Sequence, residues 1–116
     1  MGETITRFKV FGALGSVELD ALVETGATFT KIPRLEDERI GVEAKYETEV
    51  ELADGRLVPR KLGLAEVQIA DVRRPVLLAV GADGEKPVLG YTTLENLGFK
   101  VNPITRLLER ARPIEF

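Results

Sequence analysis

The sequence contains no cysteine and no histidine, and these two absences exclude most familiar kinds of active site. Without cysteine there are no disulfides and no thiol nucleophiles, and without histidine there is no Ser-His catalytic pair. Zinc sites of the usual kind need the same two residue types. The chemistry left to this chain is that of carboxylates and lysines, and we expect neither a metal nor another cofactor.

Aromatic residues and an excess of positive charge are also scarce. The 116 residues include two Tyr, five Phe and no Trp, and 16 basic residues stand against 19 acidic ones, for a net charge of −3. The basic residues are scattered along the chain, so neither a basic stripe nor a set of stacking rings is available for nucleic acid. We therefore expect no nucleic-acid partner.

Long hydrophobic runs are missing as well. The first residues, "MGETITRFK", lack the apolar core of a signal peptide, and no later window approaches the length of a membrane span. We expect a cytoplasmic protein with no membrane partner. A chain of 116 residues has room for one core but not for two lobes, so residues 1–116 are expected to form a single domain. Any wide cleft must then be shared with a second chain.

The patterning that is present has mostly a period of two. Residues 16–23, "SVELDALV", alternate and then end in an apolar pair, as a strand does when it enters a core. Residues 46–70 read as two strands around Asp54-Gly55, a dipeptide typical of a tight hairpin with positive backbone angles. Asp83-Gly84 predicts a second hairpin. Pro59 cannot donate to a ladder, which places its strand at an edge or beside a bulge.

Two short segments carry helical signals. Residues 33–41, "PRLEDERIG", have Pro33 suited to a first turn, acids early in the run and Gly41 placed to end it. Residues 92–98, "TTLENLG", begin with hydroxyl residues able to cap a helix and stop at Gly98. Together these patterns predict a mostly β domain with one or two small helices.

An acid at the end of an apolar strand points to a family. Residues 21–33, "ALVETGATFTKIP", resemble the active-site loop of the retroviral-type (retropepsin-like) aspartic proteases, where an apolar strand runs into Asp-Thr-Gly-Ala or Asp-Ser-Gly-Ala. Residues 52–55, "LADG", lie where that family has its flap, and residues 87–98, "PVLGYTTLENLG", match its second loop and short helix. Residues 98–109 resemble the closing hairpin of its cellular members. At the position of the catalytic Asp this chain has Glu24.

The resemblance implies an all-β fold, a closed acid-protease barrel with one or two short helices, that assembles as a homodimer. The chemistry needs two carboxyl groups in contact across a water, of which one holds a proton and the other acts as a base. One loop supplies one acid, so the second must come from a symmetry-related copy. The substrate would be an extended peptide or protein. Ile114 and Phe116 suit either a strand added to a partner sheet or a cover for this chain's own core.

The same resemblance implies the site residues. It assigns the catalytic loop to Glu24, Thr25 and Gly26, substrate contacts to Ala27, Thr28, Asp54, Gly55, Arg56 and Val88, and the second structural loop to Leu89 and Gly90. The Thr25 hydroxyl would bond across the dimer interface, and Asp54-Gly55 would form the tip of a flap that closes over the peptide. Taken singly, Glu24 reads as a solvated surface acid and the glycines as turn residues. Only their combination favours an active site.

Glutamate in place of aspartate has a physical consequence. One more methylene lengthens each acid by roughly 1.5 Å, and a displacement of about 1 Å at a reacting group can cost on the order of 100-fold in rate. We therefore predict an aspartic-type endopeptidase that is weakened by Glu24. The alternative is a catalytically inactive dimer of the protease fold that binds peptides or serves as an assembly module.

Overall fold

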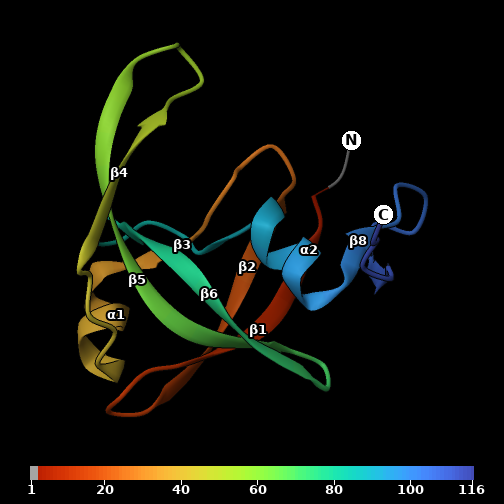
Figure 1. Ribbon diagram of the computed structural model, residues 1–116, viewed down its shortest axis with the longest axis horizontal. Coiled ribbons are helices and arrows are strands. Elements are labelled where there is room, and N and C mark those ends of the chain that lie inside the picture. Colours follow the sequence, from red (N-terminus) through yellow and green to blue (C-terminus); the bar gives the residue numbers. More distant parts are fainter. Residues whose placement is uncertain (1–2) are drawn as a thin grey trace.

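The computed structural model describes residues 3–116 as a β-barrel from which one hairpin projects (Figure 1). Its strands run in the order β1-β2-β7-β3-β6-β5-β4, and β1 also pairs with β5, which closes six strands into a barrel and leaves β4 outside it. The predicted all-β closed barrel with two short helices is confirmed. The elements are β1 (Ile5–Phe11), β2 (Ser16–Glu24), β3 (Thr30–Pro33), α1 (Arg34–Ile40), β4 (Tyr46–Glu51), β5 (Leu57–Ile69), β6 (Val72–Gly81), β7 (Val88–Gly90), α2 (Tyr91–Leu97), β8 (Phe99–Val101) and β9 (Leu108–Arg110).

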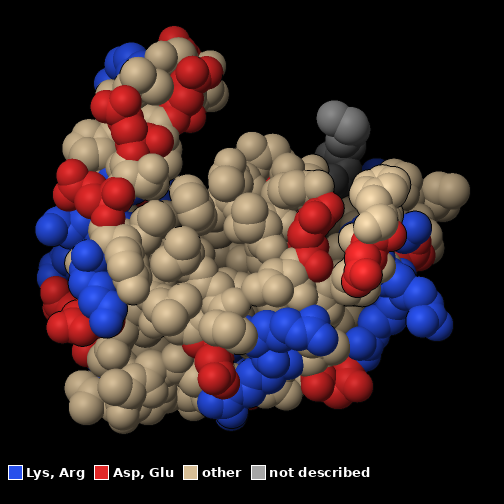
Figure 2. Space-filling view, in the orientation of Figure 1, with Lys and Arg blue, Asp and Glu red and all other residues tan. Residues whose placement is uncertain are grey.

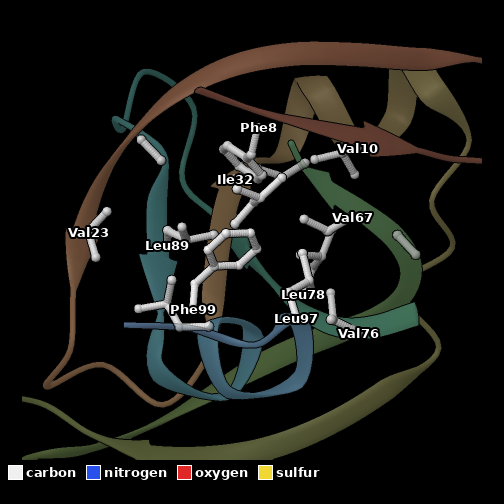
Figure 3. Packing of buried hydrophobic residues seen from close by; sticks show 14 of the residues in the cluster. Phe8, Val10, Val23, Ile32, Val67, Val76, Leu78, Leu89, Leu97 and Phe99 are labelled. Atoms are coloured by element: carbon white, nitrogen blue, oxygen red, sulfur yellow. The ribbon is translucent and has the colours of Figure 1, made fainter. Parts of the chain in front are cut away.

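The core fills the barrel with the inward residues of each alternating strand. In β2, Ala21 and Val23 are buried while Ser16 is exposed, as the period-two pattern predicts. Figure 3 shows how residues of β1, β3, β5, β6 and β7 meet inside the barrel, with Leu97 and Phe99 packed in the same cluster. Each fully buried Leu, Ile or Val contributes about 1.5–3 kcal/mol to folding.

Both predicted helices are present, with small differences at their starts. Pro33 is the N-cap of α1 instead of a residue in its first turn, and Gly41, with φ 79°, ends the helix. The second helix, α2, starts at Tyr91, one residue earlier than predicted, and Gly98 ends it with φ 82°. The expected hydroxyl cap on α2 is wrong, because Gly90 occupies the N-cap position and no side chain caps the helix.

The hairpin at Asp54-Gly55 is confirmed, although its turn is wider than expected. Strands β4 and β5 pair from Tyr46 opposite Leu62 to Glu51 opposite Leu57. The Leu52 amide donates to the Arg56 carbonyl at 2.8 Å, and of the two predicted turn residues only Gly55, at φ 89°, has a positive angle. Over residues 57–61, β5 pairs with β4 alone, which is the edge position that Pro59 predicts.

The second predicted hairpin, at Asp83-Gly84, is wrong. A turn forms there, with the Glu85 amide donating to the Ala82 carbonyl at 3.2 Å and Gly84 at φ 82°. The strands on either side of it, β6 and β7, do not pair with each other, because β3 lies between them and bonds to both. The local turn signal is therefore correct, but the neighbour of each strand is decided by a distant segment.

A hairpin that we did not predict from the sequence joins β5 to β6. Its two turn residues are Ala70 and Asp71, and Ala70 has φ 53°, a region that favours glycine or asparagine. The closing hairpin of β8 with β9 is present as the resemblance implies. Ile114 and Phe116 are exposed, so neither covers this chain's core. In the described residues 3–116, no helix is long and apolar enough to span a membrane.

Candidate functional site

Glu24 is the last residue of β2, and the parallel strand β7 fixes its backbone position. Val23 pairs with Leu89 and Glu24 with Gly90. Both Leu89 and Gly90 are buried, whereas the Glu24 side chain is exposed. A Cβ at Gly90 would lie 2.4 Å from the carbonyl carbon and oxygen of Phe29, so this position requires glycine if β7 is to approach the loop after Glu24.

The loop after Glu24, residues 25–29, is bonded to the start of α2. The Ala27 amide donates to the Glu24 carbonyl at 3.0 Å, and the Ala27 carbonyl accepts from the Tyr91 amide at 2.7 Å. The Thr28 carbonyl accepts from both the amide and the hydroxyl of Thr92, at 3.1 and 2.6 Å. The first amides of a helix have no partner within the helix. Here those of α2 hold the loop, which explains why the Thr92 hydroxyl is not a cap.

A buried pair of threonines lies beneath the loop. The Thr30 hydroxyl accepts from the Gly90 amide at 3.0 Å and donates to the Thr93 hydroxyl at 2.7 Å, and both side chains are fully buried. We did not predict this pair from the sequence. The signal that could have revealed it is a hydroxyl residue at an inward position of an apolar pattern, since Thr30 lies two residues before Ile32 and on the same inward face.

Gly26 differs from Gly90 in what surrounds it. A Cβ at Gly26 would meet only the Oε1 atom of Glu24, at 3.9 Å, and the residue is not among the glycines with positive φ. The packing of this subunit therefore does not require glycine here. Thr25 and Thr28 are exposed beside it, and Ala27 is half-buried.

Glu24 shares one face of the sheet with three nearby side chains. Val88 pairs with Leu22 on one side and with Lys31 on the other. Paired residues of neighbouring strands place their side chains on the same face, and Glu24 lies two residues beyond Leu22. Leu22, Val88 and Lys31 are half-buried on this face.

Asp54, Gly55 and Arg56 lie at the tip of the β4–β5 hairpin, away from Glu24 within one subunit. Figure 2 shows the hairpin standing clear of the body, with mainly uncharged surface below it. The Asp54 carboxylate accepts from the backbone amide of Arg56 at 3.0 Å and from its Nε at 2.7 Å, and these bonds lower the pKa of Asp54. The three residues are exposed.

A groove of about 970 Å³ also borders Glu24. Its lining includes Glu24, Thr25, Tyr91, Leu94, Phe99 and Ile114, which come from the loop, α2, β8 and the C-terminal segment. Glu24 thus lines this partly apolar groove and also lies on the sheet face that holds Val88 and Lys31. No group of three His, Cys, Asp or Glu side chains that could hold a metal occurs among residues 3–116.

Comparison with known proteins agrees with this arrangement. The family model described as Aspartyl protease matches residues 8–102, which contain the Glu24 loop, the projecting hairpin and the second loop. No curated protein matches the sequence.

Two solved structures show the same fold. The EIAV protease complexed with the inhibitor HBY-793 superposes with a TM-score of 0.59 at 19% identity, over 87% of this chain and 93% of that one. The retroviral protease-like domain of Ddi1 from Leishmania major has a TM-score of 0.58 at 18% identity, over 92% and 88% of the two chains. With its barrel, its loop and the family match in agreement, the chain belongs to the aspartyl protease family.

Proposed function

We propose that this protein is a homodimeric aspartic-type endopeptidase in which the Glu24 carboxyls of two copies activate a water between them. The observation that carries the proposal is an exposed acid on a deeply anchored loop. Glu24 faces solvent, whereas the backbone on both sides of it is fixed by β7, by the start of α2 and by the buried Thr30–Thr93 pair. A surface acid without a role would not need a loop held so firmly.

The second copy is needed because one subunit supplies one acid. The groove beside Glu24 and Thr25 has an apolar lining from Leu94 and Phe99, which a partner would remove from water. A two-fold axis passing by Thr25 would bring the two Glu24 carboxyls together. It would also place the two Gly26 residues close to each other, which supplies a reason for glycine that a single subunit lacks.

The chemistry follows from two like acids in contact. They cannot both ionise easily, so one keeps a proton while the other is a carboxylate. The carboxylate takes a proton from water as the water oxygen attacks the peptide carbonyl carbon, and the protonated acid gives its proton to the carbonyl oxygen. The tetrahedral intermediate then collapses, and the leaving nitrogen takes up a proton as the C–N bond breaks. The β4–β5 hairpin would act as the flap, with Asp54, Gly55 and Arg56 at its tip above the peptide.

Substitution of Glu24 tests the proposal. We expect weak hydrolysis of a peptide library at mildly acid pH, a gain in Glu24→Asp as the family's shorter acid is restored, and no hydrolysis in Glu24→Gln. Glu47→Gln, an exposed acid on the hairpin, is the matched control and should behave like the unmodified chain. Hydrolysis that persists in Glu24→Gln, or an inactive Glu24→Asp dimer, would contradict the proposal.

The length of the Glu24 side chain favours a second candidate, a dimer of the protease fold that binds peptides or serves as an assembly module without cleaving them. Two glutamates on a shared axis crowd each other or turn aside, so the water between them is harder to hold. This candidate predicts peptide binding with no cleavage by the unmodified chain. Cleavage that disappears in Glu24→Gln would defeat it.

A further inference from the structure

Lys31 places a positive charge on the same sheet face as Glu24. Lys31 of β3 pairs with Val88 of β7, which pairs with Leu22 of β2, and Glu24 follows two residues later. Since paired residues share a face, the lysine lies on the same face as Glu24, two strands away. Its side chain is about one-third exposed.

Arg60 lies on the same face, further along the sheet. Lys31 also pairs with Ala79 of β6, and Ala79 pairs with Leu62 of β5. Arg60 precedes Leu62 by two residues and therefore shares its face. It is half-buried, whereas Lys61, the next residue, lies on the opposite face of the strand and is exposed.

Glu85 is the carboxylate that pairs with Lys31, and the charge of Arg60 also acts on it. It lies in the turn between β6 and β7, and its Oε2 is 2.8 Å from the Nζ of Lys31. The hydrogen bond from Lys31 is the main cause that lowers the pKa of Glu85, and the charge of Arg60 lowers it further. The neighbouring acid, Asp83, is bonded to Arg34 at 2.7 Å.

The charges of this group of residues do not balance. Within residues 3–116 Arg60 forms no ion pair, and its Nη1 donates only to the carbonyl of Pro59, at 3.0 Å. Lys31 is paired with Glu85, which leaves the positive charge of Arg60 without an ion-pair partner among residues 3–116. A guanidinium presents a fork of donors that matches a carboxylate in a bidentate arrangement.

We propose that Lys31 and Arg60, together with Glu85, form a pocket that selects an acidic side chain of the peptide substrate. This inference rests on the proposed function, because the pocket is a substrate pocket only if peptides bind beneath the hairpin. A substrate Asp or Glu would supply the missing negative charge and bond to Arg60. In a symmetric dimer each subunit contributes one such pocket, so acids would be selected at matched positions on the two sides of the cleaved bond.

The expected selectivity is moderate, because the pocket is partly open to solvent. A charge-assisted hydrogen bond in such a place favours Asp or Glu over Asn or Gln by about tenfold. The preference should weaken as salt is added, since exposed charges are screened within about 8 Å at 0.15 M ionic strength.

One peptide library tests both the pocket and the peptidase. Peptides randomised around a central apolar pair are digested with Glu24→Asp, and the same library is captured on the immobilised unmodified chain, with residue frequencies read by mass spectrometry. We expect acidic residues to be enriched about tenfold in both arms. Arg60→Glu should turn the preference towards Lys and Arg, and Glu85→Gln should strengthen the acidic preference. Lys61→Glu makes the same change of charge on the opposite face of the strand and should leave the preference unaltered.

The outcomes separate the two proposals. Cleavage without acidic enrichment, or enrichment that survives Arg60→Glu, overturns the pocket and leaves the peptidase standing. Acidic capture that depends on Arg60, with no cleavage by any form, supports the pocket and refutes the peptidase. Library digests and captures with no acidic enrichment and no cleavage overturn both. If circular dichroism shows that Arg60→Glu is unfolded, Glu85→Gln decides, and an unchanged preference in that variant overturns the pocket.

Discussion

The loop after Glu24 and the tip of the β4–β5 hairpin are both short connections, but they are held in opposite ways. The loop, residues 25–29, receives hydrogen bonds from α2 and lies above the buried Thr30–Thr93 pair. The tip, residues 52–56, is held by bonds among its own residues, such as Leu52 to Arg56 and Arg56 to Asp54. A segment bonded only to itself opens at lower cost than one bonded into the core. The backbone that carries Glu24 is therefore held in place, and we expect the hairpin tip to move more readily.

The largest expected effect on stability comes from replacing a glycine that contacts the loop, and the same replacement at the hairpin tip should cost much less. Gly90→Ala places a Cβ 2.4 Å from backbone atoms of Phe29, so the loop must shift, and we expect a loss of roughly 4 kcal/mol or more in unfolding free energy. Gly55→Ala at the tip meets nothing within 4 Å and has only its φ of 89° to accommodate, at about 1 kcal/mol. Urea unfolding measures both. Similar losses in the two variants would break the contrast.

A second large effect concerns Asp37, in the helix that leads into the hairpin. The side chain is 3% exposed and neither carboxyl oxygen has a hydrogen-bond partner among residues 3–116. Burial, with a smaller contribution from the charge of Glu36, raises the pKa of Asp37 to about 7. An aspartate in the unfolded chain has a pKa of about 3.9. Between these two values Asp37 is therefore protonated in the folded state and ionised in the unfolded state.

The pKa shift of Asp37 makes the folded state less stable as the pH rises. The contribution of Asp37 to stability is fully present below about pH 4 and is lost as the pH rises to about 7, a change of about 4 kcal/mol. We expect Asp37→Asn to remove most of this slope in urea unfolding measured from pH 4 to pH 8. Glu36→Gln, which changes the neighbouring charge and keeps Asp37, should remove only a small part. A slope unchanged in Asp37→Asn would show that the group is not buried as described.

A smaller effect tests the buried threonine pair that anchors the loop. Thr93→Val keeps the shape and removes the hydroxyl, so the Thr30 hydroxyl loses its acceptor and the unfolding free energy should fall by about 1–2 kcal/mol. Thr48→Val on the hairpin makes the same change at a half-buried position and should stay within about 0.5 kcal/mol. Equal losses of unfolding free energy in the two variants would mean that the buried hydrogen bond does not stabilise the loop more than the hairpin is stabilised by Thr48.

The smallest effect is a gain. Ala70 in the β5–β6 turn has φ 53°, a conformation that costs a residue with a Cβ about 1–2 kcal/mol. Ala70→Gly relieves this cost but leaves the unfolded chain freer, so we expect a net gain of up to about 1 kcal/mol in thermal or urea unfolding. A clear loss of stability would contradict the assigned turn geometry.

Features encoded locally were predictable from the sequence. Gly41 and Gly98 end their helices in the left-handed conformation, and the alternation of β2 fixes which of its residues are buried. The position of Glu24 at the end of an apolar strand followed from the same pattern. Each of these features depends on residues close together in the chain.

The features that were missed depend on distant partners. Thr30 and Thr93 are 63 residues apart, and neither has a local pattern that names the other. The turn at Asp83-Gly84 formed as predicted, but β3 took the place between β6 and β7. The Ala70-Asp71 turn was missed because it lacks the glycine or asparagine that usually marks such turns. Which strands pair depends on the packing of the whole core, so the pairing cannot be inferred from the sequence of one segment.

A single cysteine tests most directly the claim that Glu24 faces its own copy. The chain has no cysteine, so Thr25→Cys introduces the only thiol, and a disulfide can form only between two chains whose Cβ atoms approach within about 4.5 Å. We predict that oxidised Thr25→Cys runs as a covalent dimer on a non-reducing gel and returns to a monomer on reduction, whereas Ser16→Cys, at the other end of β2, does not cross-link. Thr25→Cys that stays monomeric under oxidation, in a protein that also sediments as a monomer, would contradict the shared axis and the activity proposed for it.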